Sequence, residues 1–441
     1  MSHFFKVQSL EQVMQLVSEF EAVATETLHI SKAYHRLLAK DIYSDQDIPG
    51  FKRATMDGYA IYSGSSFGAS ESNPAWLEVK GSILMGERPN FSVELGQAAK
   101  ISTGGMLPDG ADSVVMVEHT EVVGSSEDKE NYSPTVEIYK SVAPLQNVID
   151  KDEDFKKGEK ILEAGTILRP QEIGLMAALG ISELAVYKIP KVGIISTGDE
   201  IVPIDQTPQH GKVRDINSYT LAGLVIEAGA EPVLYGIVKD DKDALYQACR
   251  AALDETDMVL ISGGSSVGVR DFTVDILSLL KDTKILVHGI SISPGKPTIL
   301  AKSASSFDST GFDSSSSAGY SKIKPIWGLP GHVVSAMVVF KVVVLPFLQR
   351  LQGLSSFGQN SSSQLIRAKL TRNVASAQGR REFVRVRFIK ERDDLFAQPI
   401  LGKSGLIRTM VMADGLLEID ENREGLEKGE IVNIIPLRAF S

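Results

Sequence analysis

The sequence predicts a multidomain chain that combines a central α/β domain with all-β modules, and three observations support this. At 441 residues the chain is too long for a single hydrophobic core. Strand-like and helix-like segments alternate between residues 183 and 352, which is typical of a mostly parallel sheet covered by helices on both faces. Segments 47–144 and 358–441 instead carry short apolar runs broken by Gly, Pro, Asn and Asp, which favours β modules.

The first predicted elements form an arm with an insertion. Helical apolar spacing over residues 9–39, and an amphipathic helix over 170–180 with Pro near its start and Gly at its end, predict a discontinuous helical domain. This domain comprises residues 1–46 and 145–182, with the β module of residues 47–144 inserted into it. Within the module we expect strands at 59–62, 76–79 and 113–118.

The α/β domain, residues 183–352, has the clearest alternation of patterns. Its predicted strands are 191–195, 232–238, 258–262, 284–287, 298–301 and 325–327. Its predicted helices are 219–228, capped by Asn217 or Ser218 and ended by Gly229, then 243–253, 272–280 and 333–348. The Ser-rich stretch 303–321 is interpreted as a surface excursion between two strands, with a phosphorylated regulatory loop as the alternative.

The C-terminal domain, residues 358–441, is predicted to be a small β-barrel or sandwich. Apolar runs separated by Gly indicate its strands, which are expected at 365–370, 382–388, 416–419 and 430–435.

Composition and charge narrow the class of protein. The formal net charge of −10 argues against general binding of nucleic acid or anionic membranes. The single cysteine, Cys249, excludes an internal disulfide and a cysteine-based zinc cluster, and its helical surroundings favour a buried, inert thiol. The N-terminus lacks the pattern of a signal peptide, and the apolar helix 333–348, interrupted by Lys341 and Pro346, is short for a membrane span. We therefore expect a soluble, cytoplasmic protein.

Three polar, Gly-rich turns follow or precede strands of the α/β domain. Their sequences are VGIISTGDEIV (192–202), MVLISGGSSVGVRD (258–271) and ISPGKP (292–297). Ligands of open α/β sheets bind beyond the carboxyl ends of the strands, so we expect these turns to meet at an anionic, phosphate-bearing ligand. The Gly/Ser turn 262–268 lets backbone N–H groups approach a phosphate, although it matches neither the P-loop nor the dinucleotide fingerprint. Lys296, held between Pro294 and Pro297, is a rigid anion partner.

Acidic residues are concentrated at the same strand ends. Asp199 and Glu200 follow one strand, Asp240 and Asp241 follow the next, and Asp271 comes after the third. Mg²⁺ prefers a few carboxylates together with phosphate oxygens and water, so this set suits a metal shared with a phosphate. The alternative is that these acids are helix N-caps and solvated loop charges.

Other candidates are less specific. Asp57 lies at the mouth of a predicted strand and either contributes to a site or hydrogen-bonds its own turn backbone. The segment 100–105, KISTGG, is either a loop that presents donors to an oxyanion or a plain β-turn. The GLPGH run, 328–332, opens the long helix, whose N–H groups could cap another anion. We interpret His332 as a first-turn residue rather than a catalytic one.

Eight segments in order along the chain resemble the molybdopterin molybdenumtransferase family, MoeA type, which includes the C-terminal domain of gephyrin. They are DIPGF…TMDGYA, KISTGGMLPDGADSVVMVE, VGIISTGDEIV, DINSYTLAGLVIEAGAE, GIVKDD, ISGGSSVGVRDFT, PGKP and GLPGHVVSA, and they cover the chain from about residue 10 onward. The resemblance implies a discontinuous helical domain, an inserted β module, a molybdopterin-binding-type α/β domain and a C-terminal β-barrel. It also implies an elongated homodimer with active sites in clefts between subunits.

The resemblance further implies a role in molybdenum cofactor biosynthesis. The implied reaction is Mg²⁺-dependent insertion of molybdate into adenylylated molybdopterin, with release of AMP. The alternatives are a gephyrin-like scaffold without catalysis and a molybdopterin adenylyltransferase. The resemblance implies a second copy of this chain as a partner, and it also allows molybdopterin adenylyltransferase and molybdoenzyme-loading proteins. We expect no binding of nucleic acid or of a membrane. Whether the metal is molybdenum or tungsten stays open.

The residue patterns and the resemblance together assign site residues. Glu200, Asp271, Asp57 and Lys296 are the candidates for catalysis, and Glu200, Asp240 and Asp271 are the candidates for the metal. The candidates for substrate binding are Thr103, Asp154, Ser196, Thr197, Gly198, Asp240, Asp241, Gly263, Gly264, Ser265, Pro294, Gly295 and Pro297. Two features depart from the family pattern: Val333 stands where GLPG(N/H)PVSA has proline, and the Ser-rich stretch 303–321 is atypical.

Overall fold

The computed structural model describes residues 7–123, 134–263, 269–305, 322–354 and 365–438, with only the backbone described at 269–271, 305 and 322. It divides into two compact units. Unit 1 comprises residues 1–39, 165–170 and 183–441, and unit 2 comprises residues 40–164 and 171–182. Each unit has its own hydrophobic clusters, so each is described by itself.

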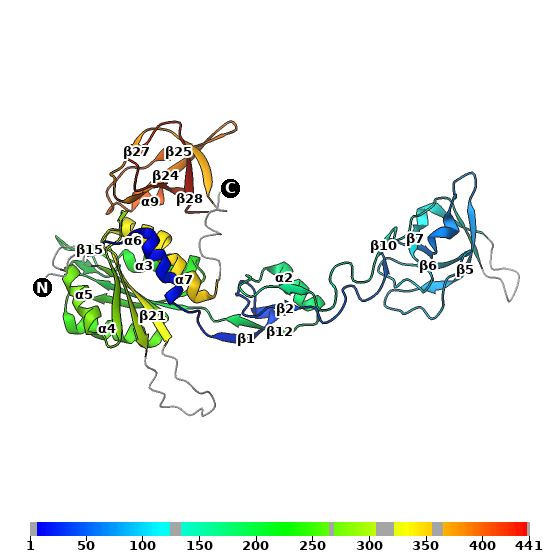
Figure 1. Ribbon diagram of the computed structural model, residues 1–441, viewed down its shortest axis with the longest axis horizontal. Coiled ribbons are helices and arrows are strands. Elements are labelled where there is room, and N and C mark those ends of the chain that lie inside the picture. Colours follow the sequence, from blue (N-terminus) through cyan, green and yellow to red (C-terminus); the bar gives the residue numbers. More distant parts are fainter. Residues whose placement is uncertain (1–6, 124–133, 264–268, 306–321, 355–364, 439–441) are drawn as a thin grey trace, which may run out of the picture. The chain divides into compact units, whose positions relative to one another are not determined.

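Unit 1 is built around a six-stranded sheet with the order β16-β13-β17-β21-β20-β18 (Figure 1). The strands β13 (Lys191–Thr197), β16 (Glu231–Val238), β17 (Met258–Gly263) and β21 (Lys322–Leu329) are parallel. The strand β20 (Ile299–Ser305) is antiparallel to both β21 and β18 (Thr283–His288). The predicted mostly parallel sheet is therefore confirmed, with one reversed strand.

Helices cover both faces of this sheet because consecutive strand residues point to opposite sides. On one face, Ile195 and Val259 pack with residues of α4 (Lys242–Glu255) and α5 (Val269–Leu279). On the other, Ile194 and Leu260 pack with α1 (Leu10–Gln15), α3 (Asn217–Glu227), α6 (Val333–Val339) and α7 (Leu345–Gln352). Fully burying one such aliphatic side chain contributes roughly 1.5–3 kcal/mol. Cys249 on α4 is buried as predicted, and burial raises the pKa of its thiol to about 12.

The long apolar helix extends farther than predicted. A π-helical turn, Phe340–Val344, joins α6 to α7, so the helical stretch Val333–Gln352 has 20 residues. Its mean hydropathy of 1.8 and its length are those of a membrane span, which corrects the expectation that it is too short. However, 61% of its apolar window is buried, and Val334, Val338 and Phe347 belong to the core of unit 1. Packing in the core therefore accounts for its apolar composition.

The prediction of helix across residues 9–39 is largely wrong. Only α1 and the 3₁₀ turn Leu16–Glu19 are helical in the first half. The strand β1 (Thr25–His29) pairs antiparallel with β12 (Glu183–Tyr187), a distant segment of the chain. This distant partner satisfies the backbone hydrogen-bonding groups of β1 and outweighs the helical spacing of its apolar residues. The periodicity of a sequence gives no information about pairing of this kind.

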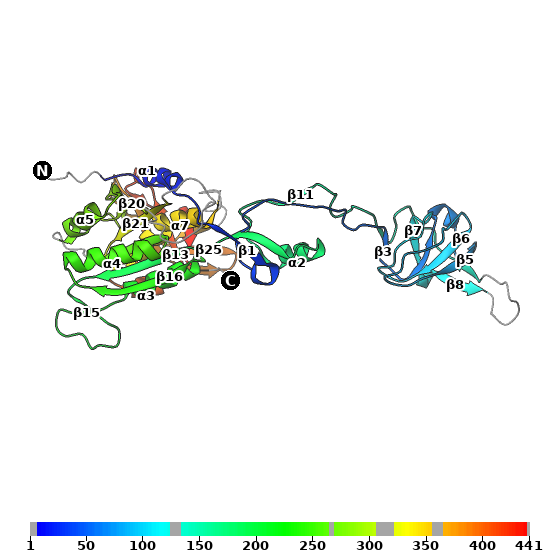
Figure 2. The same cartoon turned by 90° about the horizontal axis from the view of Figure 1, so that it is seen from below.

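Unit 2 contains a six-stranded sheet with the order β7-β4-β6-β5-β9-β8, drawn in blue and cyan in Figure 2. Separate hydrophobic clusters form on either side of it, centred on residues such as Ala60 and Val114 on one side and Ile61 and Val115 on the other. Its strands are β4 (Gly58–Ile61), β5 (Ala75–Ile83), β6 (Gln97–Ile101), β7 (Ser113–Met116), β8 (Thr120–Val123) and β9 (Thr135–Ile138). The three predicted strands of the β module are all present.

The rest of unit 2 includes short paired segments and a helix. The pairs are β2 (Ile42–Tyr43) with β11 (Lys160–Leu162), and β3 (Arg53–Ala54) with β10 (Val148–Ile149). The predicted helix near residue 170 is confirmed as α2 (Pro170–Ala178).

The C-terminal region of unit 1 is a closed five-stranded barrel, which decides between the barrel and the sandwich. Its strands follow the order β24-β25-β22-β28-β26, and a pairing of β24 with β26 closes it. The strands are β22 (Ile366–Leu370), β24 (Arg381–Glu391), β25 (Asp394–Pro399), β26 (Gly415–Ile419) and β28 (Ile431–Pro436). A short strand from the α/β region, β19 (Ile292–Ser293), adds to β24 in parallel.

Candidate functional site

The candidate site lies along one edge of the unit 1 sheet. The register aligns Ile195, Ile261, Gly328 and Ile299 in one row across β13, β17, β21 and β20. Because β20 runs in the opposite direction, the loop before it, Pro294 to Pro297, lies at the edge where the parallel strands end. Neighbouring strands are about 4.8 Å apart, so the ends of β13 and β20 are separated by roughly 14 Å across the sheet.

The hydroxyls of Ser196 and Thr197 bind carboxylates of the neighbouring loops. Both residues belong to β13, which continues two residues beyond its predicted end, and both are fully buried. Ser196 Oγ donates to Asp215 Oδ1, and Thr197 Oγ1 donates to Asp240 Oδ1, each at 2.9 Å. The Asp240 N–H donates to Asp199 Oδ1 at 3.3 Å. These contacts join the loop after β13 to the loop after β16.

The Glu200 carboxylate lies over the end of β13. Gly198 has a φ of +149°, and a Cβ there would lie 2.9 Å from Glu200 Oε2. The backbone of Glu200 is fixed because its carbonyl accepts a hydrogen bond from the Val213 N–H at 2.8 Å. This bond belongs to the pairing of β14 (Ile201–Val202) with β15 (Val213–Arg214). Glu200 is thus an exposed acid whose carboxylate lies next to Gly198, the residue after Thr197.

Two glycines are required by close packing at this edge. Gly263 has a φ of +149°, and a Cβ there would lie 1.8 Å from the Thr197 carbonyl oxygen. Gly295 has a φ of +120°, and its Cβ would lie 2.4 Å from Val339 Cγ2. Only glycine fits such positions without displacing neighbouring atoms. The predicted site residues Gly264 and Ser265, and the side chain of Asp271, lie outside the described residues.

A buried polar network was not anticipated from the sequence. Asn217 Nδ2 donates to Ser262 Oγ at 2.7 Å and to the Gly331 carbonyl at 2.8 Å. Asp215 Oδ1 accepts from the Ser218 N–H at 3.1 Å in addition to Ser196 Oγ. The predicted cap is wrong, because Ile216 is the N-cap of α3 and Asn217 begins the helix. The Asp-Ile-Asn-Ser run suggested a helix start, but nothing in it indicated hydrogen bonds from Asn217 to Ser262 and Gly331.

Two polar atoms of this network are buried without a hydrogen-bond partner in the described part of the chain, Asn217 Oδ1 and Ser218 Oγ. Leaving a buried polar atom unpaired costs about 1–3 kcal/mol. Such orphaned atoms at a ligand edge are compatible with a bound molecule that carries hydrogen-bonding groups.

Lys296 is an exposed cation on a constrained loop. The Ile290 N–H donates to the Lys296 carbonyl at 2.9 Å, and Thr298 Oγ1 donates to the Gly295 carbonyl at 2.7 Å. The Ser293–Pro294 peptide is cis. Among the described residues the Lys296 ammonium has no ion pair. Its positive charge therefore remains available to an anion.

The loop before α6 contacts the C-terminal barrel. His332 is the N-cap of α6 rather than a residue of its first turn, which corrects the prediction. His332 Nδ1 and Ser404 Oγ share a hydrogen bond of 2.8 Å, and the Val334 N–H donates to the Ser404 carbonyl at 3.1 Å. A barrel loop thus supplies a partner to one of the backbone N–H groups at this helix start.

In unit 2, Asp57 and Thr103 form a pair. Asp57 Oδ1 accepts from the Thr103 N–H at 2.7 Å and from Thr103 Oγ1 at 3.1 Å. These two hydrogen bonds, the backbone one first, lower the pKa of the exposed Asp57 carboxyl. Asp57 therefore bonds to a distant loop rather than to its own turn. Asp154 lies in a separate exposed turn, where its N–H donates to the Ile48 carbonyl at 3.0 Å.

The described acids do not form a complete metal site. Within those residues no three His, Cys, Asp or Glu side chains are close enough to hold an ion by themselves. Asp241 is a helix N-cap, which is the alternative interpretation that the sequence allowed for these acids. Its side chain accepts a hydrogen bond from the Ala244 N–H at the start of α4, at 2.8 Å. Mg²⁺ is commonly held by one or two carboxylates plus substrate phosphates. Glu200 and Asp240 fit that mode, in which the substrate completes the ligand set.

Fold and site together define a multidomain α/β protein whose ligand edge is lined by glycines, hydroxyls and acids. Three family models match in order: the MoeA N-terminal region (domain I and II) over residues 8–180, a probable molybdopterin binding domain over 193–350, and the MoeA C-terminal region (domain IV) over 367–437.

Full-length relatives agree with these matches. A Methanocaldococcus jannaschii protein, provisionally named as a molybdopterin biosynthesis protein, is 37% identical over 97% of this chain and 96% of its own. The molybdopterin molybdenumtransferase of Haemophilus influenzae is 31% identical over 93% of this chain and 94% of its own. The solved structure of a molybdopterin biosynthesis MoeA protein from Pyrococcus horikoshii has a TM-score of 0.77 at 35% identity, and covers 99% of this chain and 100% of that one.

The chain therefore belongs to the MoeA-type molybdopterin molybdenumtransferase family. It is accordingly a transferase of molybdenum cofactor biosynthesis.

Proposed function

We propose that the protein inserts molybdate into adenylylated molybdopterin with the assistance of Mg²⁺ and releases AMP. The observation that carries this proposal is the common sheet edge shared by the Thr197–Asp240 contact, Gly263 and the Lys296 loop. A pterin nucleotide has ring systems at its two ends and phosphates between them. A ligand of that length can reach both ends of an edge that spans roughly 14 Å.

The chemistry of the residues suits the proposed substrates. Lys296 offers an exposed ammonium, which has no ion pair within the described part of the chain, to an oxyanion such as molybdate or phosphate. Gly263 lets the ends of β13 and β17 approach closely at this edge, because a Cβ there would lie 1.8 Å from the Thr197 carbonyl oxygen. Glu200 and Asp240 would hold the metal, and Mg²⁺ supplies positive charge that stabilises a departing phosphate. The acid–hydroxyl contacts of Ser196 and Thr197 keep the carboxylates of Asp215 and Asp240 in place before substrate arrives.

We further propose a cytoplasmic homodimer. In this assembly, unit 2 of one subunit supplies Asp57 and Thr103 to the sheet edge of the other. One basis for this proposal is the family resemblance. The other is that Asp57 is exposed and that the two hydrogen bonds from Thr103 favour its ionised form. An exposed carboxylate that is held by two donors has a fixed orientation and can still contact a ligand.

The decisive experiment supplies purified full-length protein with adenylylated molybdopterin, MgCl₂ and molybdate, and measures AMP by chromatography. We expect AMP release that requires both molybdate and Mg²⁺. Intact substrate after prolonged incubation would contradict the proposal and favour the scaffold alternative. Consumption of ATP with unmodified molybdopterin, in the absence of molybdate, would instead identify an adenylyltransferase.

A further inference from the structure

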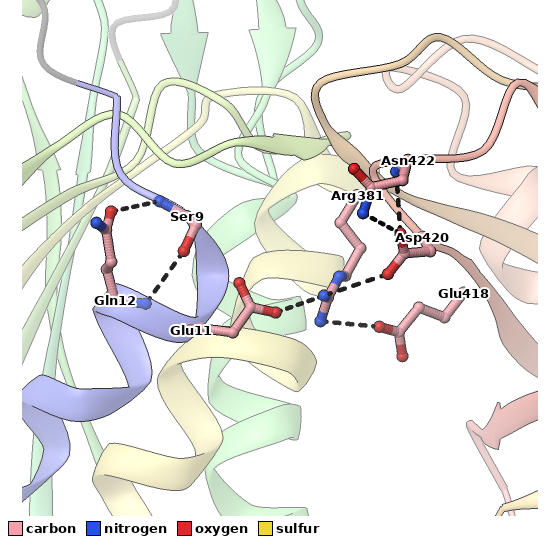
Figure 3. Close-up of polar contacts among 7 residues, drawn as sticks. All are labelled: Ser9, Glu11, Gln12, Arg381, Glu418, Asp420 and Asn422. Atoms are coloured by element: carbon pink, nitrogen blue, oxygen red, sulfur yellow. Dashed lines mark hydrogen bonds and ion pairs between the residues drawn. The ribbon is translucent and has the colours of Figure 1, made fainter.

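Arg381 is the centre of a charged cluster that joins the two ends of unit 1 (Figure 3). Its guanidinium pairs with Glu11 of α1, with Glu418 Oε1 at 3.1 Å and with Asp420 Oδ2 at 3.7 Å. The Arg381 side chain is only 19% exposed, and a guanidinium presents five donors in a planar fork that can serve several carboxylates. This cluster lies outside the ligand edge described above, and the proposed reaction does not use it.

The N-terminal partner of Arg381 is held in a fixed position. Ser9 and Gln12 form a capping box at the start of α1, in which Ser9 Oγ accepts from the Gln12 N–H and Gln12 Oε1 accepts from the Ser9 N–H. Glu11 therefore sits in a defined first helical turn. A carboxylate in that turn is also favoured by the helix dipole.

The backbone of Arg381 holds the strand that leads into the Lys296 loop. The Arg381 N–H donates to the Ser291 carbonyl at 2.9 Å, and Arg381 pairs with Ile292 in the β19–β24 register. On the other side, the Ser291 N–H donates to the Gln8 carbonyl at 2.8 Å, and the Gln8 N–H donates to the Gly289 carbonyl at 3.0 Å. The segment before Pro294 is thus held between the N-terminal segment and the barrel.

The ion pair between Glu11 and Arg381 closes this arrangement into a ring. Gln8 and Glu11 belong to one short segment, and Ser291 connects it to Arg381 through backbone bonds. We propose that Arg381 is a positioning residue that fixes the Pro294–Pro297 loop, and with it the Lys296 ammonium, at the ligand edge. This inference rests on the proposed role of Lys296 as the anion partner.

The test compares three variants of the full-length protein with the wild type. Arg381→Gln removes the charge, Glu11→Gln removes only the N-terminal partner, and Arg381→Lys keeps a cation. We expect Arg381→Gln to raise the KM for molybdate by about fivefold while kcat changes by less than about twofold, because misplacement of a binding group weakens the capture of the anion. Glu11→Gln should act in the same direction, and Arg381→Lys should restore part of the loss.

Amide hydrogen exchange supplies a readout that does not depend on turnover. In Arg381→Gln, peptides that cover residues 289–298 should exchange at least about threefold faster, because local opening follows the loss of packing and pairing around them. Lys369→Gln is the control, since it removes a cation that pairs with Asp394 between β22 and β25 of the same barrel and leaves β19 untouched. It should leave both KM and the exchange of 289–298 at wild-type values.

The outcomes separate this inference from the proposed function. A wild type that releases no AMP refutes the proposed function, and the exchange measurement then still decides whether Arg381 holds the loop. A wild type with normal turnover and an Arg381→Gln variant with unchanged KM overturns the inference, even if exchange increases. If Arg381→Gln fails to fold by circular dichroism, the Glu11→Gln variant decides by the same criteria.

Discussion

Gly263 shows how strongly a single residue constrains the ligand edge. Its φ is +149°, and a Cβ on this residue would lie only 1.8 Å from the Thr197 carbonyl oxygen, so the ends of β13 and β17 approach more closely than any side chain allows. Thr197 also donates through its hydroxyl to Asp240 Oδ1 at 2.9 Å. A change at Gly263 should therefore act on the acids of the site through the backbone.

We predict that Gly263→Ala lowers the free energy of unfolding by about 2 kcal/mol or more and reduces AMP release, because the strand ends must separate. Chemical denaturation and the AMP assay check this. Gly223→Ala is the matched control, since Gly223 lies in α3 with nothing within 4 Å of its Cβ position. That variant should gain roughly 0.5–1 kcal/mol from helix propensity. A Gly263→Ala variant as stable as wild type would disprove the close approach.

Sequence patterns revealed some of the site residues and hid others for a physical reason. Glycines and acids at strand ends are visible because they interrupt apolar runs, as at Gly263 and Glu200. Asp215 and Asn217 were missed because their roles depend on Ser196, Ser262 and Gly331, which lie far away along the chain. Hydrogen bonds of this kind leave no local pattern.

At the scale of the element, Val333 has a clear structural setting. It is the first residue of α6, where proline is well tolerated because the N–H of that position has no intrahelical acceptor. The preceding residue, His332, has φ −70° and ψ 123°, an extended conformation that proline favours in its predecessor. The absence of the family's usual proline therefore does not require a different helix entry.

We predict that Val333→Pro changes the free energy of unfolding by less than about 1 kcal/mol, with the reduced freedom of the unfolded chain offsetting the lost packing. Val334→Pro should instead cost about 1–3 kcal/mol, because proline there cannot donate to the Ser404 carbonyl and leaves that acceptor without its partner. Thermal and urea unfolding of the two variants provide the comparison. Equal destabilisation by both substitutions would show that the helix start is not where the structure places it.

Elements with strong local signals were predicted well, and elements set by distant partners were not. The α/β alternation located every strand of the six-stranded sheet, because each strand is an apolar run between turn residues. The strand β1 was predicted as helix, since its identity depends on pairing with β12. The closure of the barrel likewise depends on the pairing of β24 with β26, and the local pattern of neither strand predicts that pairing.

At the scale of the whole molecule, the hydrophobic clusters are divided between the units. Three clusters belong to unit 1 and two to unit 2, and among the described residues none is shared. Units with separate cores can unfold separately, so a single melting temperature does not describe such a chain.

We predict at least two resolved transitions in differential scanning calorimetry. Gly58→Ala should lower only the transition of unit 2, because a Cβ at Gly58 would lie 1.9 Å from the Val115 carbonyl oxygen inside that unit's sheet. Gly263→Ala should lower only a transition of unit 1. One cooperative transition that both substitutions shift equally would show that the units unfold as one body.

The reversed direction of β20 has a consequence for how this chain can vary. The connection between β20 and β21 begins after Ser305 and ends before Lys322, at the far end of the pairing from Ile299 and Gly328. Seven strand residues separate the two ends, a length of roughly 20 Å. The atypical Ser-rich stretch of this sequence is therefore attached at the end of the β20–β21 pair opposite the candidate ligand edge, where added residues leave the strand ends at that edge unchanged.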